Sequence, residues 1–227
     1  MNLLKTIFEY DDHWTHEDAD YSTTQITGGS RYQIYLANQN TPKTHKIKTE
    51  DKVTASLGTG FHMRAEQVIN ASDLDVQTEV SLFGEISGHK ISGTADVIYD
   101  NGLETIVGDF KTKGHFGFIK ALDGDVDDII RQLSVYAYLY ADKEGSEMAT
   151  KGQIYLVRTG DNKFLSKADK INYPYGVPRY KTIEVTLMTV EEVEEMVATR
   201  ALGSEQVDCE VWRCSWCEYQ CEHRKEK

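Results

Sequence analysis

The sequence predicts an α/β fold: a mixed central β-sheet flanked by helices, followed by a cysteine-rich, metal-binding C-terminal tail. Three observations support this prediction. Two segments rich in β-branched residues, 93–99 and 104–111, are joined by the turn residues 100–102, which indicates a β-hairpin. Segments with apolar residues at helical spacing precede and follow that hairpin. All four cysteines of the chain lie between 209 and 221.

The length and hydropathy of the chain bound its organisation. With 227 residues it can form one substantial domain with an appendage. We expect a single domain over 1–203, with a helical N-terminal part (1–70) and a core (71–203), and a separate tail over 204–227. No apolar run approaches the length of a membrane span, and the start of the chain turns acidic too early for a signal peptide. We therefore expect a cytoplasmic protein that does not contact a membrane.

The net charge of −12 argues at first against a nucleic-acid partner, because phosphate binding depends on lysine and arginine. The charge is unevenly distributed, however. Basic residues exceed acidic ones by three in 31–70 and by four in 146–181, whereas 71–145 carries a net charge of −8. The basic segments could bind phosphate groups, and a solvated mosaic of surface charge explains them equally well.

Aromatic residues accompany part of this positive charge. Tyr173, Tyr175 and Tyr180 lie beside Arg179 and Lys181. Such a mixture could stack on single-stranded bases. It could equally be a loop packed on the sheet.

The N-terminal part is expected to be mainly helical. Aromatic residues among acidic ones in 1–30 indicate a short helix or strand, followed by a turn at 27–30. Ser30 can cap the helix that follows it, and the polar stretch 38–44 ends that helix. Apolar residues at helical spacing predict a second helix over 56–70.

The rest of the chain is expected to mix strands and helices. Alternation predicts an antiparallel strand over 76–86, in which Glu79 points away from the apolar face and is a minor candidate for the site. The acidic residues that precede the next helix suit the positive end of its dipole, and they lack the closing glutamate of a calcium loop. The expected elements after the hairpin are a loop over 114–124, a helix over 126–140, strands over 152–159 and 181–187, and a helix over 189–202.

Three polar residues in the hairpin point to a specific chemistry. Asp96 lies in the apolar segment GTADV, and Asp109 and Lys111 lie in TIVGDFK. Asp109 and Lys111 share a face, because successive strand residues point to opposite faces. A carboxylate among apolar residues needs a partner or a metal ion. Two carboxylates on neighbouring strands can hold divalent cations, and the lysine can orient or deprotonate a water or stabilise developing negative charge.

This hairpin resembles the signature of the PD-(D/E)XK nuclease superfamily, specifically its RecB-type branch of exonucleases and CRISPR-associated nucleases. The resemblance implies a restriction-endonuclease-like core in which Asp96 and Asp109 bind Mg²⁺ or Mn²⁺ and Lys111 is catalytic. The backbone carbonyl of Phe110 is expected as a further metal ligand. A lone Asp-x-Lys pair on a strand would otherwise indicate only a solvated face.

The resemblance extends to the helices on both sides of the hairpin. Gly58, His62 and Glu66 match a Gly-x-x-x-His-x-x-x-Glu run in which the histidine is a metal ligand. Without this resemblance, a half-buried histidine bonded to the backbone would be the better interpretation of His62. Gln132 and Tyr136 match a Gln-x-x-x-Tyr pair that positions the substrate or the catalytic lysine.

The tail has the spacing Cys-x4-Cys-x2-Cys-x3-Cys. Four crowded thiols in a reducing compartment favour a metal site over disulfides, and tetrahedral sulfur suits Zn²⁺ or an iron–sulfur cluster. RecB-type nucleases with a cluster typically use one cysteine far upstream, whereas no cysteine precedes Cys209, so both metals stay open. His223 could also replace one cysteine. The expected ligands are Cys209, Cys214, Cys217 and Cys221.

We therefore expect a Mg²⁺- or Mn²⁺-dependent deoxyribonuclease, and more specifically an exonuclease. Its substrate would be single-stranded DNA or duplex ends, in recombination, repair or defence in the cytoplasm of a bacterial or phage-infected cell. Protein partners would belong to the same recombination or defence complex. The alternative is a non-catalytic DNA- or partner-binding module with the same fold, although such a module has no need of an intact Asp…Asp-x-Lys set.

Overall fold

The structure is a computed structural model that describes residues 18–28, 30–41, 49–159, 171–173, 176–204 and 219. Its strands are β1 (Tyr21–Ser22), β2 (Gln77–Ile86), β3 (His89–Asp100), β4 (Thr105–Gly114), β5 (Lys151–Thr159) and β6 (Tyr180–Thr186). Its helices are α2 (Thr23–Gly28), α3 (Arg31–Asn38), α4 (Thr49–Asn70), α5 (His115–Leu122), α6 (Asp127–Glu144) and α8 (Val190–Ala201).

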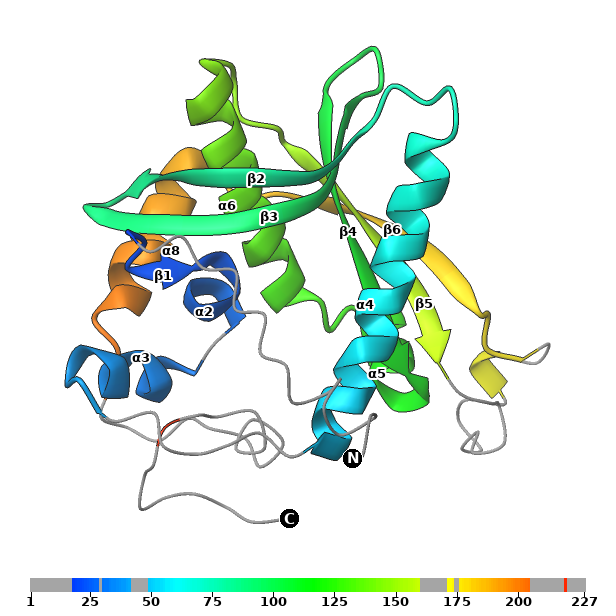
Figure 1. Cartoon of the computed structure of the whole chain (residues 1–227), viewed down its shortest axis with the longest axis horizontal. Helices are drawn as coiled ribbons and strands as arrows, with labels where there is room; N and C mark the ends of the chain where they lie inside the picture. The colour runs from blue at the N-terminus through cyan, green and yellow to red at the C-terminus, as the bar shows by residue number, and fades with distance from the viewer. Residues whose placement is uncertain are drawn as a thin grey trace, which may run out of the picture.

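The strands form one mixed sheet flanked by helices, which confirms the α/β part of the predicted fold class (Figure 1). Its order is β1-β3-β4-β5-β6, and β2 also pairs with β3. The β1–β3 and β4–β5 pairs are parallel, whereas β2–β3, β3–β4 and β5–β6 are antiparallel. The predicted meander of β2, β3 and β4 is present.

The long strand β3 has different neighbours along its length. β2 accompanies it from His89 to Ile98. β4 pairs only with residues 97–100, and β1 pairs only with Ile91 and Ser92. Beyond the short β3–β4 ladder the sheet divides, so that the β2–β3 pair runs across the molecule while β4, β5 and β6 run away from it (Figure 1). This fork in the sheet is where the site forms.

Helices α6 and α4 pack on opposite faces of β4 and β5. Leu133 of α6 packs over Gly152 of β5, and Phe61 of α4 packs over Phe110, which points to the other face of β4. Helices α2 and α8 cover α6 from outside. Buried Leu and Ile side chains of α6 and the sheet each contribute about 1.5–3 kcal/mol to folding. The fully buried core includes Leu82, Ile91, Ile98, Ile129, Leu133, Leu139, Ile154 and Leu156.

Most predicted elements are present, with small changes of boundary. Ser30 caps α3 in a capping box with Gln33, as its position before the apolar run indicates. The second predicted helix, α4, begins earlier than expected, at Thr49. Thr189 caps α8 with Glu192 in the same way. Each boundary cap satisfies backbone donors that the helix itself leaves free.

Two local predictions are wrong. The expected loop over 114–124 contains helix α5, because its apolar residues Phe118 and Ile119 are buried. Their burial outweighs the cost of about 1 kcal/mol for Gly117 in a helix. Thr27 and Gly28, expected in a turn, belong instead to α2.

Other predictions fall on residues that the structure does not describe. The aromatic N-terminal element within 1–17 lies outside the described residues, as do all four cysteines of the tail. Within the described part of the chain, no helix is both long enough and apolar enough to cross a membrane.

Candidate active site

The predicted carboxylates lie where β3 and β4 separate. The last residue pair between these strands is Val97 with Gly108, so Asp96 and Asp109 follow directly and lie opposite each other. Their side chains are nonetheless buried: Asp96 is 9% exposed and Asp109 is 1% exposed. Two buried carboxylates at the end of a strand pair require donors, cations or metal ions nearby.

Glycine at position 108 allows three strands to approach closely just before this point. A Cβ atom there would lie 2.5 Å from Val97 Cγ2 and 2.7 Å from Tyr155 Cε2, closer than van der Waals contact allows. The Phe110 N–H, two residues on, donates to Asp96 Oδ2 at 2.6 Å. The N–H and C=O of a strand residue point to the same edge of the strand, so the Phe110 carbonyl also faces the fork.

Asp109 and Lys111 contact each other, as their spacing predicts. Lys111 Nζ donates to Asp109 Oδ1 at 2.9 Å and lies 2.7 Å from Oδ2, which accepts no hydrogen bond in the described part of the chain. Burial raises the pKa of Asp109, and the Lys111 ammonium opposes that increase. Burial alone would lower the pKa of Lys111, but the charge of Asp109 raises it above its ordinary value. Lys111 therefore remains an ammonium, and Asp109 Oδ2 keeps lone pairs for a second cation.

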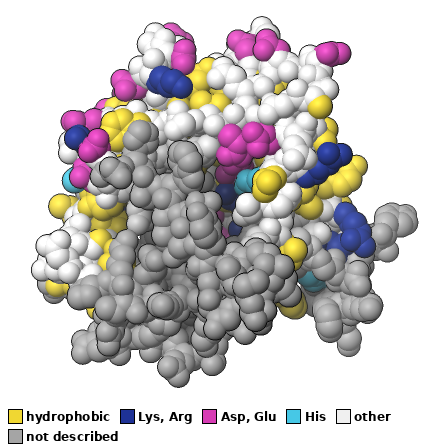
Figure 2. Space-filling model, in the orientation of Figure 1, with side chains coloured by type: hydrophobic (Ala, Val, Ile, Leu, Met, Phe, Trp, Pro, Cys, Tyr) yellow, Lys and Arg dark blue, Asp and Glu magenta, His cyan; other side chains and the backbone are white. Residues whose placement is uncertain are grey.

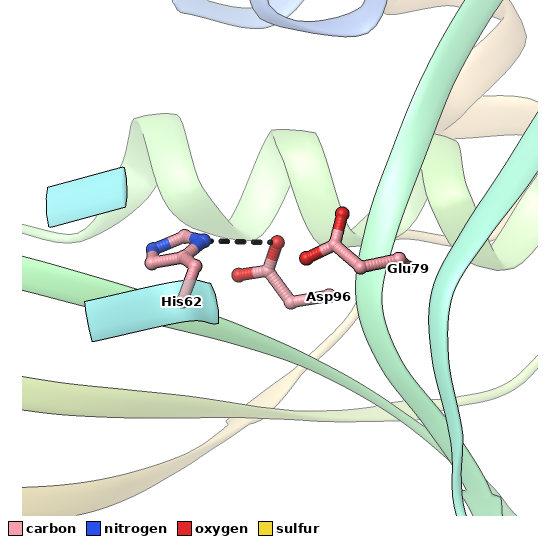
Figure 3. A group of neighbouring side chains, drawn as sticks. All are labelled: His62, Glu79 and Asp96. Atoms are coloured by element: carbon pink, nitrogen blue, oxygen red, sulfur yellow. Dashed lines mark ion pairs between the residues drawn. The ribbon is translucent and has the colours of Figure 1, made fainter. Parts of the chain in front are cut away.

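A second group of ligating side chains lies beside this ion pair. His62 on α4, Glu79 on β2 and Asp96 on β3 come together (Figure 3), and one ligand atom from each lies within 4.8 Å of the others. His62 Nδ1 is 3.5 Å from Asp96 Oδ1. The Asp96 carboxylate raises the pKa of His62, against the opposing effect of burial. Elements distant in the sequence thus place an imidazole and two carboxylates in one cluster.

Glu79 has an unusual backbone conformation for its residue type. Its φ is 48°, in the left-handed region, which costs a residue other than glycine about 1–2 kcal/mol. β2 keeps its register with β3 on both sides of this position, so the deviation is confined to the residue opposite Asp96. Burial, followed by the charges of Asp96 and Glu66, raises the pKa of Glu79. Local strain together with like-charge repulsion is typical of functional positions.

Gln132 and Tyr136 on α6 form the predicted pair. Gln132 Nε2 donates to Tyr136 Oη at 2.8 Å. Tyr136 is 3% exposed, and burial, followed by the charge of Asp109, raises the pKa of its hydroxyl, which stays protonated. The ring packs against β3, where a Cβ atom on Gly93 would lie 2.7 Å from Tyr136 Cε1. Helix α6 therefore lies directly against the strands that carry the carboxylates.

The structure brings together the predicted residues of the described part. His62 and Asp96 share one cluster, and Asp109 and Lys111 form an ion pair next to it. Glu79, which sequence reasoning held only as a minor candidate, joins the cluster. Its one signal was an acidic side chain on the polar face of an alternating strand. The predicted second metal site lies outside the described residues: Cys209, Cys214, Cys217 and Cys221.

The donor set of the cluster fits a hard divalent cation. Carboxylate oxygens are the preferred ligands of Mg²⁺, and Mn²⁺ accepts carboxylate and imidazole together. The repulsion between Glu79 and Asp96 is relieved by a positive charge. A metal ion at this position would thus reduce a repulsion that the protein alone leaves in place, whereas the charge of Asp109 is already balanced by Lys111.

Solved structures of other proteins resemble this fold. The crystal structure of SSO0001 has a TM-score of 0.61 and 19% sequence identity, over 99% of this chain and 96% of that one. This likeness shows a shared fold. A phage related exonuclease from Haemophilus somnus 129PT has a TM-score of 0.45 and 14% identity, over 89% of this chain and 83% of that one. No curated protein matches the chain.

The family comparison covers most of the sequence. The model of the PD-(D/E)XK nuclease superfamily matches residues 32–224, a range that contains every side chain of the site. The Asp…Asp-x-Lys arrangement at the fork agrees with that match. The chain belongs to the PD-(D/E)XK nuclease superfamily.

Proposed function

We propose that the protein is a Mg²⁺- or Mn²⁺-dependent DNA nuclease of the RecB type that removes nucleotides from DNA ends. One observation carries the proposal: the cluster of His62, Glu79 and Asp96 lies beside the ion pair of the half-buried Lys111 with the buried Asp109. A binding module does not need a strained glutamate and a half-buried, ion-paired lysine next to a potential metal site. The resemblance to RecB-type exonucleases supports cleavage from ends.

The metal ligands in this proposal are His62, Asp96, Asp109 and the Phe110 carbonyl, with Glu79 as an additional carboxylate. A bound ion would polarise a phosphate oxygen and lower the pKa of a coordinated water. In this proposal the protein contributes five donors, from three strands and one helix, to the bound ion. The Asp96 carboxylate is oriented before an ion binds, because the Phe110 N–H donates to its Oδ2 atom at 2.6 Å.

Lys111 has a distinct role in the proposal. Asp109 holds its ammonium on the side of the fork, at 2.9 and 2.7 Å from the two carboxylate oxygens. From there Lys111 can donate to the attacking water or to a phosphate oxygen that gains negative charge. Tyr136, fixed by Gln132, supports the buried side of this arrangement.

The remaining parts of the proposal concern the whole chain. We assign residues 1–203 to the nuclease domain and residues 204–227 to a tail in which the four cysteines hold Zn²⁺ or an iron–sulfur cluster. Spacing alone supports this second metal site. Its proposed role is to stabilise the fold, since the cluster at the fork contains the groups needed for hydrolysis.

The test is cleavage of end-labelled linear DNA and of closed circular DNA, single- and double-stranded, with Mn²⁺, with Mg²⁺ and with EDTA. We expect metal-dependent release of nucleotides from linear DNA and intact circles. DNA binding by the wild-type protein without any cleavage under these conditions would refute the nuclease proposal. Cleavage of circles would refute the restriction to ends.

Matched variants assign the residues. Lys111→Gln and Asp96→Asn should reduce cleavage at least about a hundredfold. Lys120→Gln and Asp100→Asn change exposed residues of the same types and should leave the rate within about twofold. Cleavage at the wild-type rate by Lys111→Gln and Asp96→Asn would show that the assigned centre is wrong.

A further inference from the structure

A pocket of about 490 Å³ opens between α4 and the strands β5 and β6. This volume lies within the range of about 300–1,000 Å³ that is typical of small-ligand sites. No metal-cluster residue lines it. Its walls are Phe61, Tyr155, Leu156, Val157, Arg158, Arg179, Tyr180, Lys181 and Thr182.

A short row of aromatic rings connects the pocket to the metal cluster. Phe110 occupies the middle of the row: its ring centroid is 6.0 Å from that of His62 and 5.0 Å from that of Tyr155. Phe61, at 5.7 Å from Phe110, borders the pocket on the α4 side. The pocket is thus two ring-to-ring steps from the imidazole of the cluster. These two steps, of 6.0 and 5.0 Å, place the pocket close to any strand bound at the cluster.

The aromatic walls differ in burial. Tyr155 is fixed, because its hydroxyl donates to Gln153 Oε1 at 2.7 Å and its ring packs on Phe110. Tyr180 lies at the rim, on the edge strand β6, with 78% of its surface exposed. A rigid ring inside and an exposed ring at the mouth can enclose a flat aromatic group. Among the residues that the structure describes, few cover the Tyr180 ring.

Exposed positive charge borders the outer side of the pocket, while the buried Arg158 lines it and donates to the carbonyls of Val177 and Pro178. Arg179 and Lys181 flank Tyr180 on β6 and are exposed. In Figure 2, Lys and Arg side chains without acidic neighbours lie at the right-hand edge of the molecule, whereas at its upper left they lie among acidic side chains. A ligand would therefore place an uncharged, flat part in the pocket and negative groups along the rim. Nucleotides in a strand combine these two features.

We propose that this pocket binds one unpaired base of the DNA strand whose neighbouring phosphate enters the metal cluster. The base would stack on Tyr155 and Tyr180, and Lys181 and Arg179 would contact the adjacent backbone. A base reaches such a recess only when it is neither paired nor stacked on its neighbours, so the site selects single strands and frayed ends. The assignment of the phosphate rests on the proposed nuclease function, but base binding can be measured without cleavage.

Fluorescence anisotropy in EDTA tests the binding itself. The probes are a fluorescein-labelled twelve-nucleotide thymidine strand and a hairpin duplex of equal charge. Wild type should bind the strand more tightly than the duplex, and Tyr180→Ala should weaken strand binding about five- to hundredfold, the effect of losing one stacked base. Lys181→Gln should weaken it less and reduce its salt dependence. Phe83→Ala and Lys143→Gln change an exposed aromatic residue and an exposed lysine outside the pocket, and should bind as wild type.

A series of strands, each with an abasic nucleotide at a different position, then identifies which nucleotide places its base in the pocket. One abasic position should weaken binding to wild type, and Tyr180→Ala should be insensitive to that same position. Equal binding of all abasic strands by wild type, or unchanged abasic sensitivity in Tyr180→Ala, would overturn the proposal. Equal affinity for strand and duplex would do so as well. Base-specific binding without metal-dependent cleavage would keep the pocket and reject the nuclease proposal.

Discussion

The position of α4 relative to β4 can be tested at Gly58. A Cβ atom on Gly58 would lie 3.0 Å from Thr112 Oγ1 on β4, whereas nothing lies within 4 Å of a Cβ atom on Gly60. Gly58 thus lets the helix approach the strand, one turn before His62. Gly58→Val would introduce Cβ and two methyl groups at this contact. Helix α4 then has to move by several tenths of an ångström or more.

The expected effect follows from two numbers. His62 Nδ1 is 3.5 Å from Asp96 Oδ1, the edge of direct contact, so displacement of the helix separates the cluster. A misplacement on the order of 1 Å can reduce catalysis about a hundredfold. Overpacking should also destabilise the fold by about 1–3 kcal/mol. Gly60→Val has the same change in helix propensity, a gain of a few tenths of a kcal/mol, without the clash.

The assay compares Gly58→Val and Gly60→Val by urea denaturation, by Mn²⁺ titration calorimetry and by DNA cleavage. We expect loss of stability, metal affinity and cleavage only in Gly58→Val. The double variant Gly58→Ala with Thr112→Ala, which lacks the opposing hydroxyl, should bind Mn²⁺ with the affinity of the wild type. If Gly58→Val and Gly60→Val behave alike, contact between Gly58 and Thr112 does not set the position of His62.

Three further predictions concern the two proposed metal sites. Glu79→Gly should maintain the free energy of unfolding or raise it by up to about 1 kcal/mol, because it relieves the positive φ, while Mn²⁺ affinity measured by calorimetry falls at least about tenfold. Glu79→Gln keeps the strain and should show only the loss of affinity. Unchanged affinity in both variants would remove Glu79 from the site. Mn²⁺ at a hundred times its dissociation constant should stabilise the wild type by about 2.7 kcal/mol in thermal unfolding, reversibly with EDTA; the same stabilisation in Asp96→Asn would place the ion elsewhere. The double variant Cys214→Ser with Cys217→Ser should have a lower melting temperature and solubility, because metal ligation can contribute on the order of 10 kcal/mol to ordering such a segment. Elemental analysis with a visible absorbance scan distinguishes zinc from iron. A metal-free wild type with free thiols and an unaltered melting temperature would contradict the proposal.

Features that depend on short stretches of sequence were predictable. The hairpin turn at 100–102, the shared face of Asp109 and Lys111 and the Ser30 cap each follow from the local geometry of a few residues. The i+4 contact of Gln132 with Tyr136 follows from helix geometry in the same way. In each case a strand or helix imposes the distance, so the chain needs no distant partner to specify it.

Other features required the packing of distant segments. The sequence alternation of β2 placed Glu79 on its polar face, but its positive φ and its approach to His62 arise because β2, β3 and α4 meet at the fork. The pocket beside Phe110 likewise needs α4 on one side and β6 on the other. Helix α5 forms where glycines indicated a loop, because burial of Phe118 outweighs local propensity. Helix propensity contributes tenths of a kcal/mol per residue, whereas burial between distant segments contributes about 1.5–3 kcal/mol per large side chain. Burial therefore decided the structure at the places where it departs from the sequence pattern.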